Sequence, residues 1–140
     1  MMKRFFSRLA LSTALLSAVV SIGCAGPSVD IDVQALEVLH ISPHHGATEV
    51  DINVLPVVGF SEAVNPKENA VVLEKEGADG FTQVNCRHIS RDDGRAIMVV
   101  PDEVLEAGVQ YRVTVSPEAE TLGGVALMAE HVSMFVTAAE

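Results

Sequence analysis

The chain has 140 residues, enough for one domain with a single core and too few for two. It contains 9 Lys and Arg against 19 Asp and Glu. Because Lys3, Arg4 and Arg8 all precede the first acidic residue, Asp30, the rest of the chain has 6 basic against 19 acidic residues. Such an acidic surface repels phosphate backbones and anionic headgroups, which argues against nucleic acid as a partner.

The first 24 residues have the pattern of an export signal. A basic segment, Met1–Arg8, precedes an apolar run, Leu9–Ile22, whose fourteen residues are too few for a bilayer span of about 20. The run ends on Ser21-Ile22-Gly23-Cys24, which resembles a bacterial lipobox, where a small residue precedes a lipidated cysteine. The sequence predicts a helical lipoprotein signal peptide over residues 1–23 and a covalent lipid on Cys24. Ordinary signal cleavage nearby is the alternative, because Ser21 replaces the usual leucine.

Residues 24–35 combine Gly, Pro, Ser and Asp with little periodicity, and we interpret them as a tether. Its eleven residues after the cysteine extend at most about 36 Å, which keeps the following domain close to the membrane. By resemblance to the lipoprotein sorting pattern, Ala25 in place of an aspartate favours the outer membrane. A periplasmic or secreted protein is the alternative. If Cys24 is acylated through sulfur, Cys86 has no disulfide partner in the chain.

From Leu36 onward, apolar residues alternate at period two over short runs separated by turn residues, which predicts β-strands. A hairpin turn is expected at Arg91–Gly94 and a helical turn at Asp102–Ala107, stopped by Gly108. Within the fourth run, Cys86 is expected to face inward. The runs predict an all-β, seven-stranded, immunoglobulin-like Greek-key sandwich. They are Leu39–Ile41, Pro56–Phe60, Val71–Leu73, Phe81–Ile89, Ile97–Val99, Tyr111–Val115 and His131–Thr137.

Five separated motifs of this region resemble the bacterial Ig-like domain named for the SbsA surface-layer protein. They are Ile41–Val50, Val58–Pro66, Gly94–Ile97, Tyr111–Val115 and Phe135–Thr137. The resemblance covers about Leu36 to Ala138, so residues 36–140 are assigned to the domain. It implies a module of surface-layer, adhesive and secreted proteins that spaces or binds and does not catalyse.

Two groups of residues are weak candidates for metal ligation. Asp30, Asp32, Glu49 and Asp51 are candidates for a calcium site at one end of the sandwich, and His40, His44 and His45 for a transition-metal site. The histidine spacing matches no metal motif, and exposed polar residues are the simpler interpretation. No bound metal is expected. His88 and His131 are each expected to be partly buried strand residues.

No residue pattern indicates catalysis. Cys86 lacks a recognisable His and Asn arrangement, and no Gly-x-Ser-x-Gly elbow or phosphate loop is present. The sequence therefore predicts a non-enzymatic cell-envelope lipoprotein for protein interaction, adhesion or structural spacing, with no cofactor beyond the lipid on Cys24. The absence of Trp favours an envelope protein over a glycan as partner. A calcium- or carbohydrate-binding exported module is the alternative, and enzyme activity is least favoured. The segment Ala70–Glu74 is the expected edge strand for strand addition by a partner.

Overall fold

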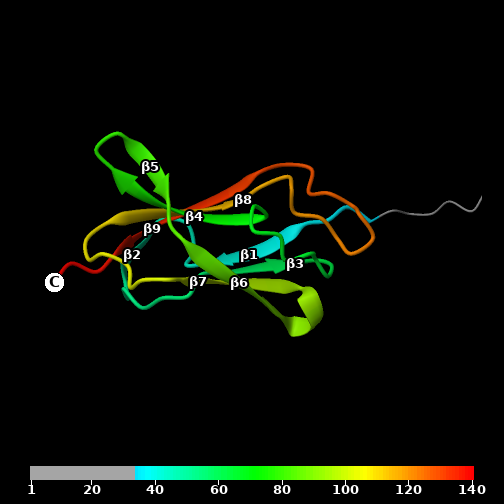
Figure 1. The fold of residues 1–140 in the computed structure, drawn as a ribbon, viewed down its shortest axis with the longest axis horizontal. Coiled ribbons are helices and arrows are strands. Elements are labelled where there is room, and N and C mark those ends of the chain that lie inside the picture. The colour runs from blue at the N-terminus through cyan, green and yellow to red at the C-terminus, as the bar shows by residue number, and fades with distance from the viewer. Residues whose placement is uncertain (1–33) are drawn as a thin grey trace, which may run out of the picture. The chain divides into compact units, whose positions relative to one another are not determined.

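The computed structural model describes residues 34–140, which form nine strands and one short 3-10 turn (Figure 1). The elements are β1 (Val38–Ser42), β2 (Ala47–Val50), β3 (Val57–Phe60), β4 (Val71–Gly77), β5 (Gly80–Gln83), β6 (Cys86–Arg91), η1 (Asp92–Gly94), β7 (Ala96–Pro101), β8 (Gln110–Val115) and β9 (His131–Thr137). In this part of the chain no helix has the length and apolar character needed to cross a bilayer.

The strands form two sheets that pack face to face. The four-stranded sheet has the order β1-β3-β7-β6, and the five-stranded sheet has the order β2-β9-β8-β4-β5. All neighbours are antiparallel except β2 and β9. The chain changes sheets five times, at β1/β2, β2/β3, β3/β4, β5/β6 and β7/β8, and the resulting topology is that of an immunoglobulin-like Greek key. The predicted all-β sandwich is confirmed.

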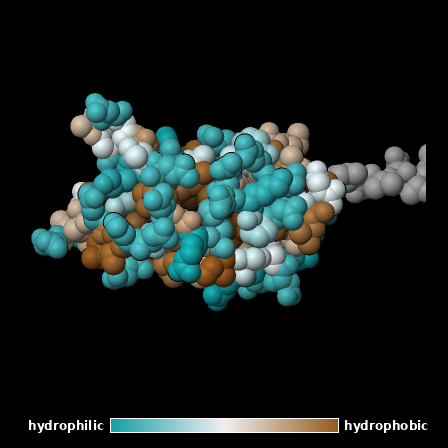
Figure 2. Space-filling model, in the orientation of Figure 1, coloured by the Kyte–Doolittle hydropathy of each residue, from teal (hydrophilic) through white to brown (hydrophobic). Residues whose placement is uncertain are grey.

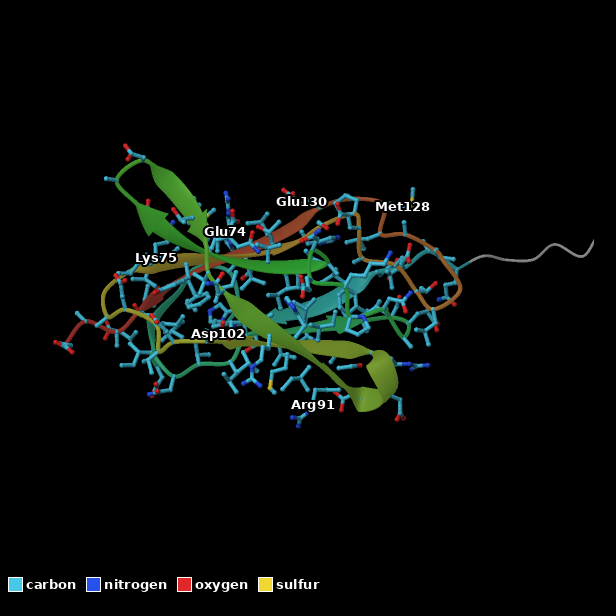
Figure 3. All side chains as sticks on the ribbon, in the orientation of Figure 1. Glu74, Lys75, Arg91, Asp102, Met128 and Glu130 are labelled. Atoms are coloured by element: carbon cyan, nitrogen blue, oxygen red, sulfur yellow. The ribbon has the colours of Figure 1, made fainter. Side chains whose placement is uncertain are left out.

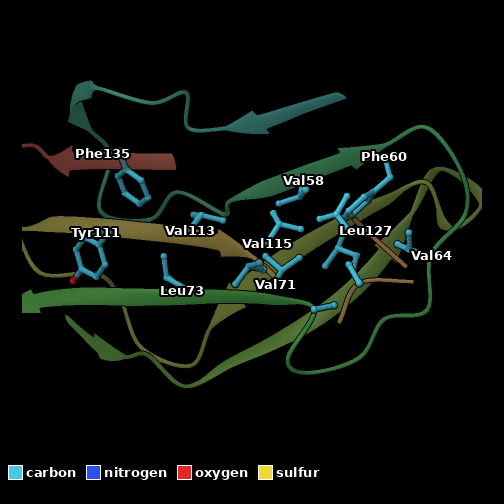
Figure 4. Packing of buried hydrophobic residues seen from close by; sticks show 14 of the residues in the cluster. Val58, Phe60, Val64, Val71, Leu73, Tyr111, Val113, Val115, Leu127 and Phe135 are labelled. Carbon is cyan, nitrogen blue, oxygen red and sulfur yellow. The ribbon is translucent and has the colours of Figure 1, made fainter. Parts of the chain in front are cut away.

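The core lies between the two sheets and is mainly aliphatic (Figure 4). Val58 and Ile97 from the four-stranded sheet face Leu73 and Val113 from the other, all fully buried. Burying each such side chain contributes about 1.5–3 kcal/mol, so this layer is the main source of stability. The one tyrosine, Tyr111, stacks on Phe135 with ring centroids 5.7 Å apart.

The structure has two strands more than the sequence predicts. The expected strand Phe81–Ile89 is divided into β5 and β6. The Val84 amide still donates to the Leu73 carbonyl of β4, whereas the next carbonyl, that of Asn85, accepts from the Asp102 amide, which follows β7. The chain thus changes sheets without interrupting the alternation of its side chains. The second addition, β2, pairs with β9 in parallel through Ala47 and Val50, with a shift in register between them.

The expected helical turn at Asp102–Ala107 is wrong. Its backbone amides bond to distant segments, Leu105 to the Ile52 carbonyl and Glu106 to the Tyr111 hydroxyl at 2.8 Å. The second contact is a tyrosine corner, a feature of immunoglobulin-like domains in which a tyrosine at a strand start holds the preceding loop. A helix would need these amides for its own carbonyls.

The expected hairpin turn at Arg91–Gly94 is confirmed and joins β6 to β7. Asp92, Asp93 and Gly94 all have positive φ angles, of 52°, 56° and 88°. Asp and Gly tolerate this backbone conformation better than other residues, which explains why the Asp-Asp-Gly sequence marks the turn.

Candidate functional site

Three of the predicted site residues, Cys24, Asp30 and Asp32, lie outside the described residues, and their roles stay predictions. Glu49 and Asp51 are exposed near the end of β2. The Asp51 carboxylate accepts hydrogen bonds from the Asn53 backbone and side chain, at 2.7 and 3.0 Å, and these bonds lower the pKa of Asp51. Across residues 34–140, no three His, Cys, Asp or Glu side chains gather in a way that would hold a metal ion.

The three neighbouring histidines contact different parts of the structure. The His40 ring covers Gly59 on the neighbouring strand β3. His45 Nδ1 accepts a hydrogen bond from the Met134 amide at 3.2 Å, and His44 is exposed in the turn before β2. The structure therefore favours the simpler interpretation of these residues as turn and strand side chains.

The other two histidines differ in burial. His88 is half-buried as predicted, and its Nε2 lies 2.7 Å from the Val71 carbonyl, so it bridges β6 and β4 across the open side of the sandwich. His131 is exposed, and the prediction that it is partly buried is wrong. It is the first residue of β9 and lies at the rim of the core, whereas Ser133 and Phe135, on the same face further along, are buried.

A groove of about 280 Å³ follows this open side between β4 and β6, and Cys86 lies in it. The thiol packs against the core, as the alternation predicts, and donates to the Val84 carbonyl at 3.3 Å. Burial, together with the nearby Asp102 carboxylate, raises the pKa of Cys86 to about 11. Because the thiolate is the nucleophilic form, the raised pKa keeps this cysteine protonated and weakly nucleophilic at neutral pH. The groove is lined by Glu68, Asn69, Val71, Val72, Leu73, Gln83, Val84, Asn85, Cys86, His88 and Asp102.

The edge strand beside this groove is β6 and not Ala70–Glu74. The strand β4, to which that segment belongs, lies between β8 and β5 and is paired on both sides. In contrast, β6 is the last strand of its sheet and pairs with β7 over six residues without a shift in register. The edge strands β1 and β2 carry register shifts, and β5 has only four residues. This leaves β6 as the longest regular unpaired edge among the described strands.

Sequence reasoning missed β6 because edge position is a property of the whole sheet. A signal was present, since Arg87 and Arg91 place two charges on one short strand, and charges are common on exposed edges. Together with Ile89, which is 39 % exposed, these arginines form the outward row of β6. Figure 3 shows Arg91 beside the η1 turn and Asp102 beyond the other end of β7. Figure 2 shows that hydrophilic residues cover most of the visible face, with smaller hydrophobic areas between them.

Solved structures with this fold include large assemblies and small proteins. Domains 1–6 of the surface-layer protein SbsC match with a TM-score of 0.54 and 14 % identity, covering 76 % of this chain and 14 % of that one. The α2-macroglobulin of E. coli matches with a TM-score of 0.55 and 16 % identity, covering 77 % and 6 %. The methionine-rich copper resistance protein PcoC of Escherichia coli matches with a TM-score of 0.60 and 17 % identity, covering 74 % and 99 %.

At these identities the likeness concerns the fold alone, and the chain spans only a small part of SbsC and of the macroglobulin. No curated protein matches the sequence. The model of one family, described as bacterial Ig-like domain, matches residues 32–137, which include every strand of the structure. The chain therefore belongs to the bacterial Ig-like domain family.

Proposed function

We propose that this chain is a non-enzymatic lipoprotein of the cell envelope, anchored through Cys24, whose Ig-like domain binds a partner protein by strand addition at β6. The observation that carries the binding role is the regular, unpaired edge of β6 beside an open groove. A free strand edge offers a row of backbone donors and acceptors that an extended segment can pair with.

The anchor and the envelope location rest on the sequence Ser21-Ile22-Gly23-Cys24 and on the basic and apolar segments before it. The family supports the same location, because SbsC, a structure of the same fold, is a surface-layer protein. The raised pKa of Cys86 supports a role without catalysis by this residue, which is the one free cysteine among the described residues.

The anchor is tested by expressing the full chain in a Gram-negative host and measuring the mass of its mature N-terminal peptide, with Cys24→Ser as the matched control. We expect an acyl mass and membrane fractionation that both depend on Cys24, because two or more acyl chains give stable anchoring. An unmodified product in the soluble fraction would remove the anchor from the proposal and leave a freely diffusing module.

The binding role is tested by placing a photo-cross-linking residue at Ile89 in the bacterium that makes the protein. The control position is Thr82, an exposed residue on the edge strand β5 of the other sheet. We expect a discrete adduct of higher mass from position 89 and none from position 82. Adducts from both positions, or from neither, would contradict binding at β6.

A further inference from the structure

Positive charge is distributed unevenly over the domain. Outside the first ten residues the chain has six basic residues. Three of them form the ion pairs of the described residues, Lys67 with Glu120, Lys75 with Glu106 and Arg112 with Glu74. The other three, Arg87, Arg91 and Arg95, have no carboxylate partner within residues 34–140, and all lie in the β6–β7 hairpin. Two of these three unpaired cations, Arg87 and Arg91, therefore lie on the regular edge strand β6, and Arg95 lies in the adjoining turn.

The outer face of the four-stranded sheet carries no carboxylate along its strands. The register between β6 and β7 places Arg87, Ile89 and Arg91 opposite Val100, Met98 and Ala96. The nearest acidic residues along the chain are Asp92 and Asp93 in the η1 turn and Asp102 after β7, all beyond the strand ends. The outward strand positions are His40, Ser42, Val57, Gly59, Arg87, Ile89, Arg91, Ala96, Met98 and Val100.

The hydrogen bond from the Asp102 amide to the Asn85 carbonyl shows which residues of β6 direct their backbone groups toward β7. In an antiparallel pair, alternate residues bond to the partner strand, so Arg87, Ile89 and Arg91 point their backbone groups toward β7. Cys86, His88 and Ser90 then point theirs toward the free edge. A strand added at this edge bonds to these three residues, and its outward side chains lie close beside Arg87, Ile89 and Arg91.

The same arginines act against pairing between two copies of β6. An antiparallel pair centred on Ile89 would place Arg87 of one copy opposite Arg91 of the other, at both ends of the strand. Like charges in directly opposed positions are destabilising, whereas opposite charges are favourable. The charge pattern therefore selects an acidic partner strand over a second copy of this chain.

We infer that the partner segment is an extended strand with two carboxylates four positions apart and an apolar residue midway between them, which pair with Arg87, Arg91 and Ile89. The inference rests on the proposed strand addition and names the chemistry of the partner. It assigns Arg87 and Arg91 as the residues that determine specificity.

The test measures binding of two labelled peptides to the full chain in detergent by fluorescence anisotropy. One peptide is Thr-Glu-Thr-Val-Thr-Glu-Thr, and the other has Lys in place of both Glu. We expect the acidic peptide to bind about tenfold more tightly, because two favourable pairs replace two repulsive ones. The preference should shrink at high salt, which screens exposed charges.

Charge reversal supplies the matched variants. In Arg87→Glu/Arg91→Glu the preference should invert, so that the lysine peptide binds more tightly. Arg91→Glu alone should weaken the preference, whereas Arg95→Glu, which changes net charge equally but lies in the turn, should leave it intact. An unchanged preference in the double variant, or equal loss in Arg91→Glu and Arg95→Glu, would overturn the assignment of these arginines.

Backbone methylation separates this inference from the proposed function. Methylating the amides of the acidic peptide that face β6 should abolish binding, while methylating the alternate set, which faces solvent, should not. If neither peptide binds the wild-type chain, strand addition itself fails. If both peptides bind equally, and methylation blocks them only at the amides that face β6, strand addition stands and the acidic partner is wrong. Self-association of the chain that the acidic peptide cannot displace would overturn the selection against a second copy.

Discussion

At the scale of single residues, burial controls the chemistry of Cys86. Its pKa rises from the ordinary 9.0 to about 11, so at pH 8 its thiolate fraction is about 100-fold below that of an exposed thiol. The measurement is the rate at which iodoacetamide alkylates Cys86 in the folded Cys24→Ser chain, followed by mass spectrometry. We expect this rate to rise with pH with a midpoint near 11. The folded state favours the protonated form of the Cys86 thiol. The contribution of this thiol to the free energy of unfolding is therefore fully present below pH 9 and is lost as the pH rises through 11. A midpoint near 9, as expected for the chain unfolded in urea, would contradict the burial argument.

A second residue-scale relation joins Gly59 and His40 across β1 and β3. A methyl group at position 59 would overlap the His40 ring, although Gly59 does not have a positive φ. Because His40 is exposed, its ring can turn into solvent, and we expect Gly59→Ala to lower the free energy of unfolding by about 1 kcal/mol or less in urea denaturation. In a His40→Ala background the same change should become neutral or stabilising, because alanine restricts the unfolded chain more than glycine does. Equal effects in both backgrounds would show that the ring is not the obstacle.

At the scale of elements, the loop before β8 is held by hydrogen bonds to β9. Thr137 is buried, with 2 % of its surface exposed. Its hydroxyl donates to the Glu106 carbonyl at 2.6 Å and accepts from the Val109 amide at 3.0 Å. We expect Thr137→Val, which keeps the shape of the side chain, to lower the free energy of unfolding by about 0.5–1.5 kcal/mol in urea denaturation. The substitution removes the hydrogen-bond partner of two partly buried backbone groups, the Glu106 carbonyl and the Val109 amide. Thr137→Ser keeps the hydroxyl and should cost less. The reverse order would contradict this account of the loop.

At the scale of the whole molecule, one shared core predicts one cooperative transition. Tyr111 fluorescence reports on the five-stranded sheet, and alkylation of Cys86 reports on the four-stranded sheet. We expect Ile97→Ala, a fully buried truncation in the four-stranded sheet, to cost about 2–5 kcal/mol and to shift both urea midpoints together. A shift confined to the Cys86 probe would mean that the sheets unfold separately.

The sequence alone determined the fold class, because each strand is short and its alternation marks the face that must be buried. In the predicted run Tyr111–Val115, the alternation puts Tyr111, Val113 and Val115 on one face of the strand, and all three are buried. The Asp-Gly pair likewise predicts the turn at Arg91–Gly94, because these residues adopt the positive φ angles that the turn has. These are local properties, and they are encoded within a few residues of chain.

Only the tertiary structure decided which strand lies at an edge and which segment remains outside regular structure. Edge position depends on which strands pair across long sequence separations, so Val71–Gly77 became a central strand and Cys86–Arg91 a free one. The helical turn failed for the same reason, since Ile52 and Tyr111 compete for its amides from distant positions. The candidate binding surface depends on both levels: the sequence supplies the arginines, and the sheet order alone leaves their strand unpaired.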